Sequence, residues 1–157
     1  MIEVSELKSI DDLSMWRNQQ IYEWWTNVPS GSPQKSDFKI ENHIRIAGGL
    51  FLLQRLAYQK FKYLICGEEI NIITGRQSHG FTFELKPPEY VGYDNFNQLI
   101  EHYEMIVETK KPYFCTGSSS LLGVKNSGFE SIDCPLFDDE GNVTHIIGSL
   151  QLKKSKL

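Results

Sequence analysis

Residues 134–152 read CPLFDDEGNVTHIIGSLQL, and this stretch contains the clearest strand–turn–strand pattern in the chain. Its middle, from Asp138 to Asn142, is rich in residue types that form turns, whereas the flanking residues are mostly apolar. The pattern predicts two antiparallel strands, over about 128–136 and 143–152, joined by a hairpin loop. A further strand is expected at about 113–119, so three consecutive strands end the chain.

A second group of strands is expected nearer the front. Residues 50–53 (LFLL) form a short apolar run of strand length, and residues 60–66 alternate in character. The alternation predicts that Phe61, Tyr63 and Ile65 point to the same side of the strand. We therefore expect an antiparallel pair in this region, with a turn at 57–59.

The strongest helical pattern lies between these two groups. Apolar residues from Phe96 to Val107 recur with the spacing of one helix face, Asp94 can cap the start, and Pro112 ends the pattern. A second amphipathic helix is expected within residues 9–25, and residues 26–37 are typical of a connecting loop.

Neither group of strands can shield a core alone. The economical solution is an α+β fold with one five-stranded antiparallel sheet, helices on one face and an additional amphipathic helix at the N-terminus. We expect an N-terminal helix and linker over residues 1–37, a domain over 38–152 and a tail over 153–157.

Composition excludes several classes of partner. The 157 residues carry a formal net charge of −4, which argues against a nucleic-acid binder that depends on phosphate contacts. No stretch approaches the ~18 apolar residues of a membrane span, so no membrane partner is expected. Three cysteines without a C-x-x-C pair, and an acidic start that predicts no secretory leader, indicate reduced thiols and a cytoplasmic location.

The order of elements and several short motifs resemble the PAS family. The final hairpin carries the family's Pro135-Leu136, Asp138, Gly141, Val143 and Ile147-Gly148, and Lys111-Pro112-Tyr113 resembles the entry into its third strand. The front resembles a bacterial single-domain PAS subfamily with an N-terminal aromatic helix, through Trp24-Trp25, Pro33, Asp37-Phe38, the residues 60–63 and Thr74-Gly75. Leu64 and Glu68 depart from that subfamily, which often has a basic and a small polar residue there.

The resemblance implies a sensory or signalling module. PAS domains bind a small molecule, haem or flavin between the sheet and the long helix, or act as dimerising adaptors without a ligand. We expect this chain to bind a small apolar ligand or an unidentified signalling protein, and to dimerise. The alternative is a ligand-free adaptor, and a more remote one is an enzyme of the ketosteroid-isomerase kind.

The predicted fold places a set of apolar and weakly polar side chains between the long helix and the sheet. These pocket candidates are Tyr63, Ile65, Leu99, Tyr103, Ile106, Cys115, Ile132, Cys134 and Ile146. They form a ligand pocket with a few polar groups, or they fill the core and leave no cavity.

The aromatic helix suggests a dimer contact. Its face carries Trp16, Ile21, Trp24 and Trp25, and aromatic residues are enriched at interfaces. A homodimer through this face is the favoured hypothesis, and a helix packed only on its own domain is the alternative.

The spacing of reactive residues predicts no enzyme and no metal or other cofactor. The four histidines form no local ligand pair, and no nucleophile motif or phosphate loop is present. His102 lies on the long helix, the element that supplies the haem ligand in haem-binding PAS domains. Because it stands at the edge of the apolar face, we do not expect haem.

Overall fold

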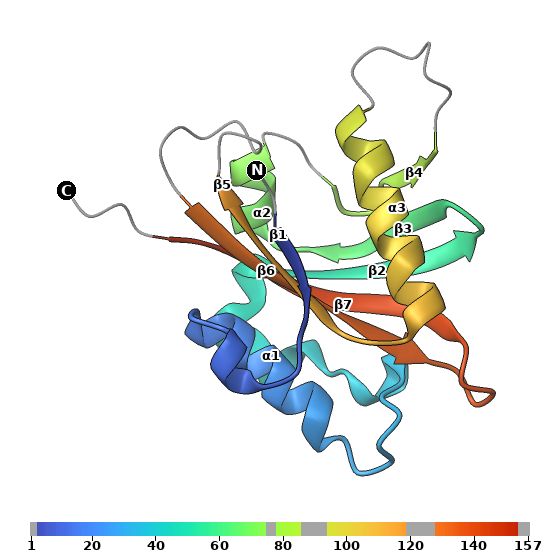
Figure 1. Ribbon diagram of the computed structural model, residues 1–157, viewed down its shortest axis with the longest axis horizontal. Coiled ribbons are helices and arrows are strands. Elements are labelled where there is room, and N and C mark those ends of the chain that lie inside the picture. The colour runs from blue at the N-terminus through green and yellow to red at the C-terminus, as the bar shows by residue number, and fades with distance from the viewer. Residues whose placement is uncertain (1–2, 75–77, 86–93, 119–127, 154–157) are drawn as a thin grey trace.

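The computed structural model describes residues 3–74, 78–85, 94–118 and 128–153, and one antiparallel sheet runs through it (Figure 1). The sheet has seven strands in the order β1-β5-β6-β7-β2-β3-β4. The strands are β1 (Glu3–Glu6), β2 (Leu50–Ala57), β3 (Lys60–Cys66), β4 (Thr82–Glu84), β5 (Tyr113–Ser118), β6 (Gly128–Phe137) and β7 (Val143–Leu152). The predicted residues 75, 119 and 154–157 lie outside the described part of the chain.

The five central strands are the five predicted ones, and the two predicted groups meet where β2 pairs with β7. That pairing runs from Leu50 opposite Ser149 to Gln54 opposite His145. The predicted α+β class and the single sheet are confirmed. The sheet is wider than predicted, because the short strands β1 and β4 add to its edges beside β5 and β3.

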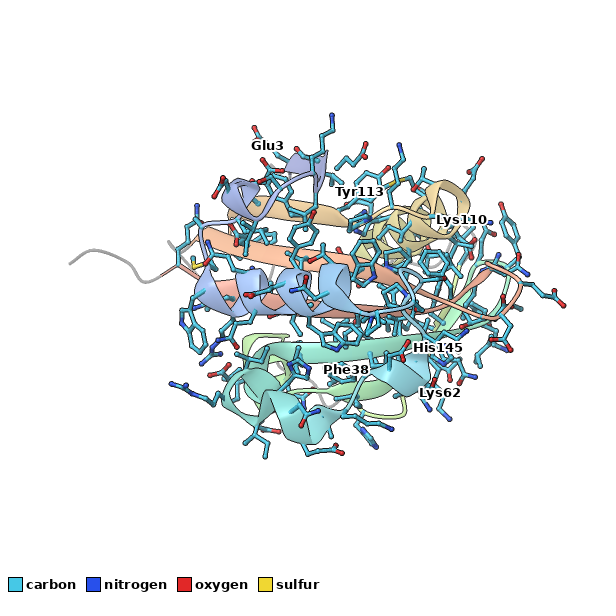
Figure 2. The ribbon with its side chains drawn as sticks, turned by 90° about the horizontal axis from the view of Figure 1, so that it is seen from below. Glu3, Phe38, Lys62, Lys110, Tyr113 and His145 are labelled. Carbon is cyan, nitrogen blue, oxygen red and sulfur yellow. The ribbon has the colours of Figure 1, made fainter. Side chains whose placement is uncertain are left out.

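Helices cover both faces of the sheet. The α-helices are α1 (Trp16–Asn27), α2 (Glu68–Thr74) and α3 (Asp94–Thr109), and the 3-10 helices are η1 (Ile10–Asp12), η2 (Lys35–Asp37) and η3 (Ile40–Gly49). Helix α3 lies across one face, and α1 lies over β6 and β7 on the other (Figures 1 and 2). None of the described helices combines the length and the apolar character needed to cross a membrane.

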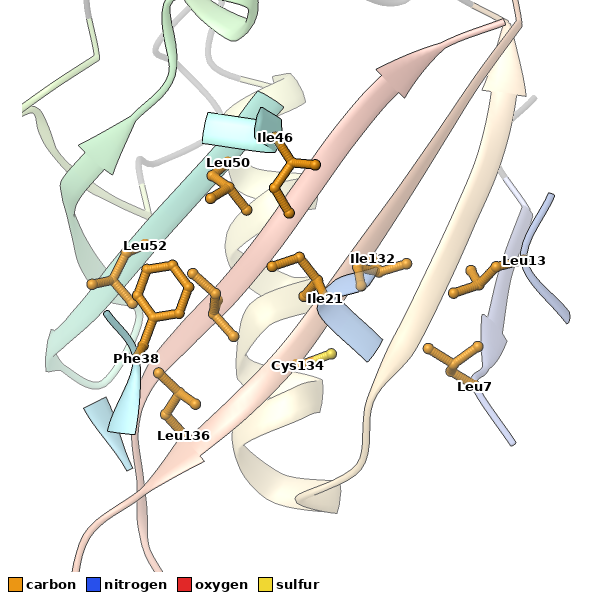
Figure 3. Close-up of a cluster of buried hydrophobic side chains, with 11 residues drawn as sticks. Leu7, Leu13, Ile21, Phe38, Ile46, Leu50, Leu52, Ile132, Cys134 and Leu136 are labelled. Atoms are coloured by element: carbon orange, nitrogen blue, oxygen red, sulfur yellow. The ribbon is translucent and has the colours of Figure 1, made fainter. Parts of the chain in front are cut away.

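Two hydrophobic cores result, one on each face. Figure 3 shows the core on the α1 face, where Ile21 of α1 meets Ile132 and Cys134 of β6. The core on the α3 face contains Tyr103 and Ile106 of α3. Because both faces are covered, residues 50–53 of β2 are all buried, which explains why these four residues form an unbroken apolar run.

Residues 3–37 pack on the same sheet as the described residues that follow. Strand β1 is part of the sheet, and Leu7, Leu13 and Ile21 lie within the α1-face core. The predicted boundary between residues 37 and 38 therefore lies between segments that contribute to the same core. The N-terminal helix is an integral layer of the domain.

A β-bulge changes which side chains of β3 face each core. Leu52 pairs with Ile65 and Leu53 pairs with Tyr63, so Leu64 is an extra residue in the ladder. The bulge shifts the alternation by one position, and Ile65 joins Leu64 against the α1-face core. An unbroken period of two does not hold across this strand.

Gly148 is predicted to be intolerant of any side chain. It lies in β7 opposite Phe51 and Asp133, and an added Cβ would stand 2.1 Å from Phe51 Cζ and 2.5 Å from the Ile132 carbonyl oxygen. We expect Gly148→Ala to lower the free energy of unfolding by about 1–3 kcal/mol through overpacking. Urea denaturation followed by circular dichroism measures the change.

The control for this prediction is Gly128→Ala in the neighbouring strand. A Cβ at Gly128 meets only the flexible Lys153 side chain closely, at 3.1 Å, so little change is expected. Equal stabilities for the wild type and Gly148→Ala would show that Phe51 does not lie over this glycine.

Candidate functional site

A buried polar centre, formed by His102, Cys115 and Asp133, lies between α3 and the sheet. His102 Nε2 is 2.9 Å from Asp133 Oδ2 and 3.9 Å from Cys115 Sγ. The side chains of His102 and Asp133 are only 13% and 4% exposed. Three elements, α3, β5 and β6, each contribute one of these residues.

Strand geometry brings the three groups together. Ile132 and Cys134 of β6 belong to the α1-face core, so Asp133 between them points to the opposite face, toward α3. Asp133 pairs with Tyr113 of β5, and Cys115 is two residues further along β5 on the same face. Helix α3 then places His102 above both strands.

Electrostatics favours a charged His102. Burial alone would lower the pKa of His102, but the hydrogen bonds to Asp133 and Cys115 and the attraction of the Asp133 carboxylate outweigh it, raising this pKa to about 10. His102 and Asp133 are therefore a buried ion pair at neutral pH. A pair this well shielded from water is strongly coupled, so removal of either partner leaves an uncompensated charge.

Aromatic rings surround the polar centre. Tyr103, next to His102, is buried, and its ring centroid lies 5.6 Å from that of Phe61 and 6.4 Å from that of Phe83. Burial, the charges of neighbouring groups and a hydrogen bond with Tyr63 raise the pKa of Tyr103 well above its usual value. Tyr103 thus keeps its proton, and the described space between α3 and this part of the sheet is occupied by ring-to-ring contacts.

Most of the predicted pocket residues come together on this face. Tyr63, Leu99, Tyr103, Ile106 and Ile146 all belong to the α3-face core or pack against it. Cys115 faces the same side through its contact with His102. Ligand binding by these residues remains a prediction.

Three predicted pocket residues lie on the α1 face of the sheet and not on the α3 face. Ile65, Ile132 and Cys134 pack in or against the α1-face core. The bulge in β3 moves Ile65, and the alternation of β6 runs opposite to the predicted one. Both faces of β6 are buried, so its apolar pattern could not identify which face meets α3. Burial, reinforced by nearby Asp133, raises the pKa of the Cys134 thiol, so this cysteine stays protonated.

The predicted dimer face is largely used within the monomer. Ile21 is fully buried, Trp25 donates a hydrogen bond from Nε1 to the carbonyl oxygen of Pro135 at 2.8 Å, and Trp24 packs edge-on against Phe38. Trp16 is 44% exposed. The prediction that Ile21 is a dimer contact is therefore wrong, because the helix needs that residue to cover its own sheet.

A second buried acid, Glu130 of β6, ties α1 to the sheet. One carboxylate oxygen of Glu130 accepts hydrogen bonds from the backbone N–H and hydroxyl of Ser14, at 2.9 Å each. The other accepts from the Met15 N–H and the Asn18 amide, at 3.0 Å each. Glu130 thus caps the N-terminus of α1 from the neighbouring strand. We call this contact the Glu130 latch.

Sequence reasoning missed both acids. His102 lies 31 residues from Asp133, and Glu130 more than a hundred from the residues that it caps, so no local motif joins them. The available signal was the presence of two charged residues within the otherwise apolar strand GFESIDCPLF. A charge buried in such a strand needs a partner.

An open groove of about 430 Å³ lies outside the polar centre, between α3 and the β2–β3 turn. A second ion pair joins its walls, with Arg55 Nη2 2.9 Å from Glu104 Oε2. Glu104 also accepts a hydrogen bond from the Gln59 N–H at 2.7 Å. This contact ties α3 to β2, whereas the polar centre ties α3 to β5 and β6.

The architecture is similar to that of solved light-oxygen-voltage proteins. An RNA-binding light-oxygen-voltage receptor aligns with a TM-score of 0.51 and 10% sequence identity over 96% of this chain, which spans 38% of the length of that receptor. This chain has a PAS-type fold. No protein-family model and no curated protein matches the sequence.

Two further structures align less closely with this PAS fold. A light-oxygen-voltage domain described with a flavin analogue has a TM-score of 0.46 and 14% identity, over 76% of this chain and 87% of its own. The light-state Aureochrome1 LOV domain has a TM-score of 0.43 and 9% identity, over 75% of this chain and 91% of its own. At these identities the likeness is one of fold alone.

Asp133→Asn is predicted to destabilise the PAS domain more at low pH than at high pH. The pKa of His102 is raised on folding, so its charge stabilises the folded state fully below the unfolded pKa near 6.5, and this contribution is lost as the pH rises through about 10. We expect a loss of about 3–5 kcal/mol near pH 6 that shrinks toward pH 10. Urea denaturation of both proteins across this range measures it, and a difference independent of pH would contradict the ion pair.

Glu130→Gln is predicted to loosen α1. The substitution keeps the shape of the side chain but removes the charge that holds the N–H groups of Ser14 and Met15, so we expect a loss of about 1.5–3 kcal/mol. Hydrogen exchange of the α1 amides should accelerate. Glu140→Gln, at an exposed position in the last hairpin, is the control and should leave α1 unchanged.

Proposed function

We propose that this chain is a sensory PAS module in which the polar centre receives a signal on one face of the sheet and α1 transmits it on the other. The observation that carries the proposal is the double role of β6. Asp133 of β6 holds His102 of α3, and Glu130 of the same strand holds the start of α1. A displacement of this strand is therefore felt on both faces.

The energetics of the polar centre suit a switch. A buried ion pair contributes little net stability when intact but costs several kcal/mol when one partner is lost. A chemical change at His102, Cys115 or Asp133 therefore has a large effect on how α3 and β6 pack. A signal shifts the equilibrium between two arrangements only by its difference in affinity for them, and a centre built from charged and soft groups offers such a difference.

The small apolar ligand predicted from the sequence is the less favoured input. Such a ligand would enter the α3-face core, where the rings of Phe61, Tyr63, Phe83 and Tyr103 already contact one another. Its entry requires these rings to move. A chemical change at the polar centre acts on groups that already contact one another, so it needs no space between these rings. The alternative of a ligand-free adaptor differs from both of these inputs, because an adaptor would receive neither a ligand nor a chemical signal on the α3 face.

We propose no catalytic role for the module. An isomerase of the ketosteroid kind needs a free carboxylate base beside a hydroxyl donor. The charge of Asp133 is one of the causes that raise the pKa of the buried Tyr103 hydroxyl, but the Asp133 carboxylate is paired with His102. The pairing supports a structural or sensory use of this acid.

The output partner is proposed to be a signalling protein that contacts α1. One matching receptor is described as RNA-binding, but this chain spans 38% of it and carries a net charge of −4, which supports a protein partner. Self-association through α1 rests on Trp16, since Ile21, Trp24 and Trp25 face the chain's own sheet or loops. Three free thiols support the proposed cytoplasmic location.

The three tryptophans offer a direct test, because all of them lie in α1. We expect His102→Gln to shift tryptophan emission to longer wavelength and to accelerate hydrogen exchange of the α1 amides at least about tenfold under native conditions. Circular dichroism verifies that the variant is folded. The physical reason is that loss of the ion pair displaces β6 and with it the Glu130 latch.

Glu104→Gln is the matched control. It also breaks an ion pair between α3 and the sheet, but that pair leads to Arg55 of β2 rather than to β6. Its α1 exchange rates should stay within about twofold of the wild type. If His102→Gln leaves α1 unchanged, or if both variants accelerate α1 equally, the two faces are not coupled through β6 and the proposal is wrong.

A further inference from the structure

Each side chain of the polar centre is of a kind that binds transition metals. His102 offers an imidazole nitrogen, Cys115 a thiol sulfur and Asp133 a carboxylate oxygen, and these three atoms all lie within 4.8 Å of one another. They come from α3, β5 and β6, so the fold and not a local motif brings them together. Cys115 and Asp133 are buried and His102 is largely so.

We propose that the polar centre is a binding site for a divalent transition-metal ion, with Zn²⁺ as the ion best suited to its ligands. The proposal rests on the proposed function in that the ion would be the signal received at the centre. The sensory proposal states only that the signal is received at the polar centre, whereas the metal proposal states that the signal is a divalent transition-metal ion.

The spacing of the ligand atoms suits such an ion. With Zn–N and Zn–O near 2.0–2.1 Å and Zn–S near 2.3 Å, tetrahedral ligand atoms stand about 3.3–3.6 Å apart. The observed 2.9 Å between His102 Nε2 and Asp133 Oδ2 and 3.9 Å between His102 Nε2 and Cys115 Sγ bracket these values. The third pair, Cys115 Sγ and the Asp133 carboxylate, lies within 4.8 Å, so the thiol and the carboxylate would move toward each other to complete the geometry.

The ligand set also selects among metals. Imidazole and thiolate favour Zn²⁺ and other first-row transition ions, whereas Mg²⁺ and Ca²⁺ favour sites made of oxygen atoms. A site with three protein ligands leaves a fourth position for water or a small anionic ligand. The apolar surroundings of Tyr103 and Ile106 limit access of competing water.

The charges of the ligand groups suit a divalent ion. A Zn²⁺ ion would be offset by the thiolate of Cys115 and the carboxylate of Asp133, with His102 as a neutral imidazole ligand. The ion would therefore add no net charge to the buried centre, and its binding would release the protons that the ligands carried.

A titration tests the proposal directly. The full chain, freed of metal with a chelator, is titrated with Zn²⁺ against a chromophoric competitor and separately with Co²⁺. We expect one ion per chain, a cobalt–thiolate charge-transfer band, visible bands of a tetrahedral cobalt ion, and a rise of several degrees in the unfolding midpoint at saturating Zn²⁺. Cys115→Ser and His102→Gln should each weaken binding about 100-fold or more and remove the charge-transfer or tetrahedral signature.

Matched variants of the same residue types serve as controls. Cys134→Ala removes the thiol on the opposite face of β6, and His145→Gln removes an imidazole of β7, so both should bind Zn²⁺ within about threefold of the wild type if folded by circular dichroism. Absence of binding by the wild type overturns the proposal. So does binding that survives Cys115→Ser, because the ion would then lie elsewhere.

The metal proposal and the sensory proposal can fail separately. If the wild type binds no Zn²⁺ but His102→Gln still loosens α1, the metal proposal is wrong and the coupling through β6 stands. If Zn²⁺ binds at the polar centre but His102→Gln leaves α1 unchanged, the polar centre is a metal-binding site and the sensory proposal is wrong.

Discussion

The pairing of β2 with β7 is the interaction on which the rest of the structure depends. It joins a hairpin from the first half of the chain to the meander that ends it, and thereby creates one continuous sheet with two faces to bury. Helix α3 covers one face and α1 the other, and both helices contact β6 and β7, so these two strands are enclosed on both sides. Within this pairing, position 148 is a glycine because the Phe51 ring and the Ile132 carbonyl occupy the space that a side chain would take.

A strand buried on both faces imposes a particular cost on charged residues. β6 carries Glu130 toward α1 and Asp133 toward α3, and neither carboxylate can reach bulk water. Each is matched by donors supplied from a helix: backbone and side-chain groups at the start of α1 for Glu130, and His102 for Asp133. The two acids therefore specify where both helices dock, which apolar packing alone does less sharply.

This arrangement gives a physical basis for communication across the sheet. The polar centre and the Glu130 latch are three residues apart on one strand but on opposite faces. Rigid backbone hydrogen bonding to β5 and β7 limits independent movement of the two positions. In this PAS fold the sheet is thus a stiff layer between a buried polar centre and an N-terminal helix, in contrast to a fold whose outer helix is attached only by apolar contacts.

The sequence by itself determined the order of elements, the hairpin at residues 138–142, the long helix ending before Pro112 and the union of two strand groups in one sheet. These features depend on local periodicity and on turn-forming residues, so residues close together in the sequence are enough to determine them. Only the tertiary structure decided which face each strand residue occupies. The extra residue Leu64 reverses the alternation of β3. Because β6 is buried on both faces, its apolar pattern does not show which of its residues face α3. The polar centre was likewise decided in three dimensions, because His102, Cys115 and Asp133 meet through packing of α3 on the sheet and share no local motif.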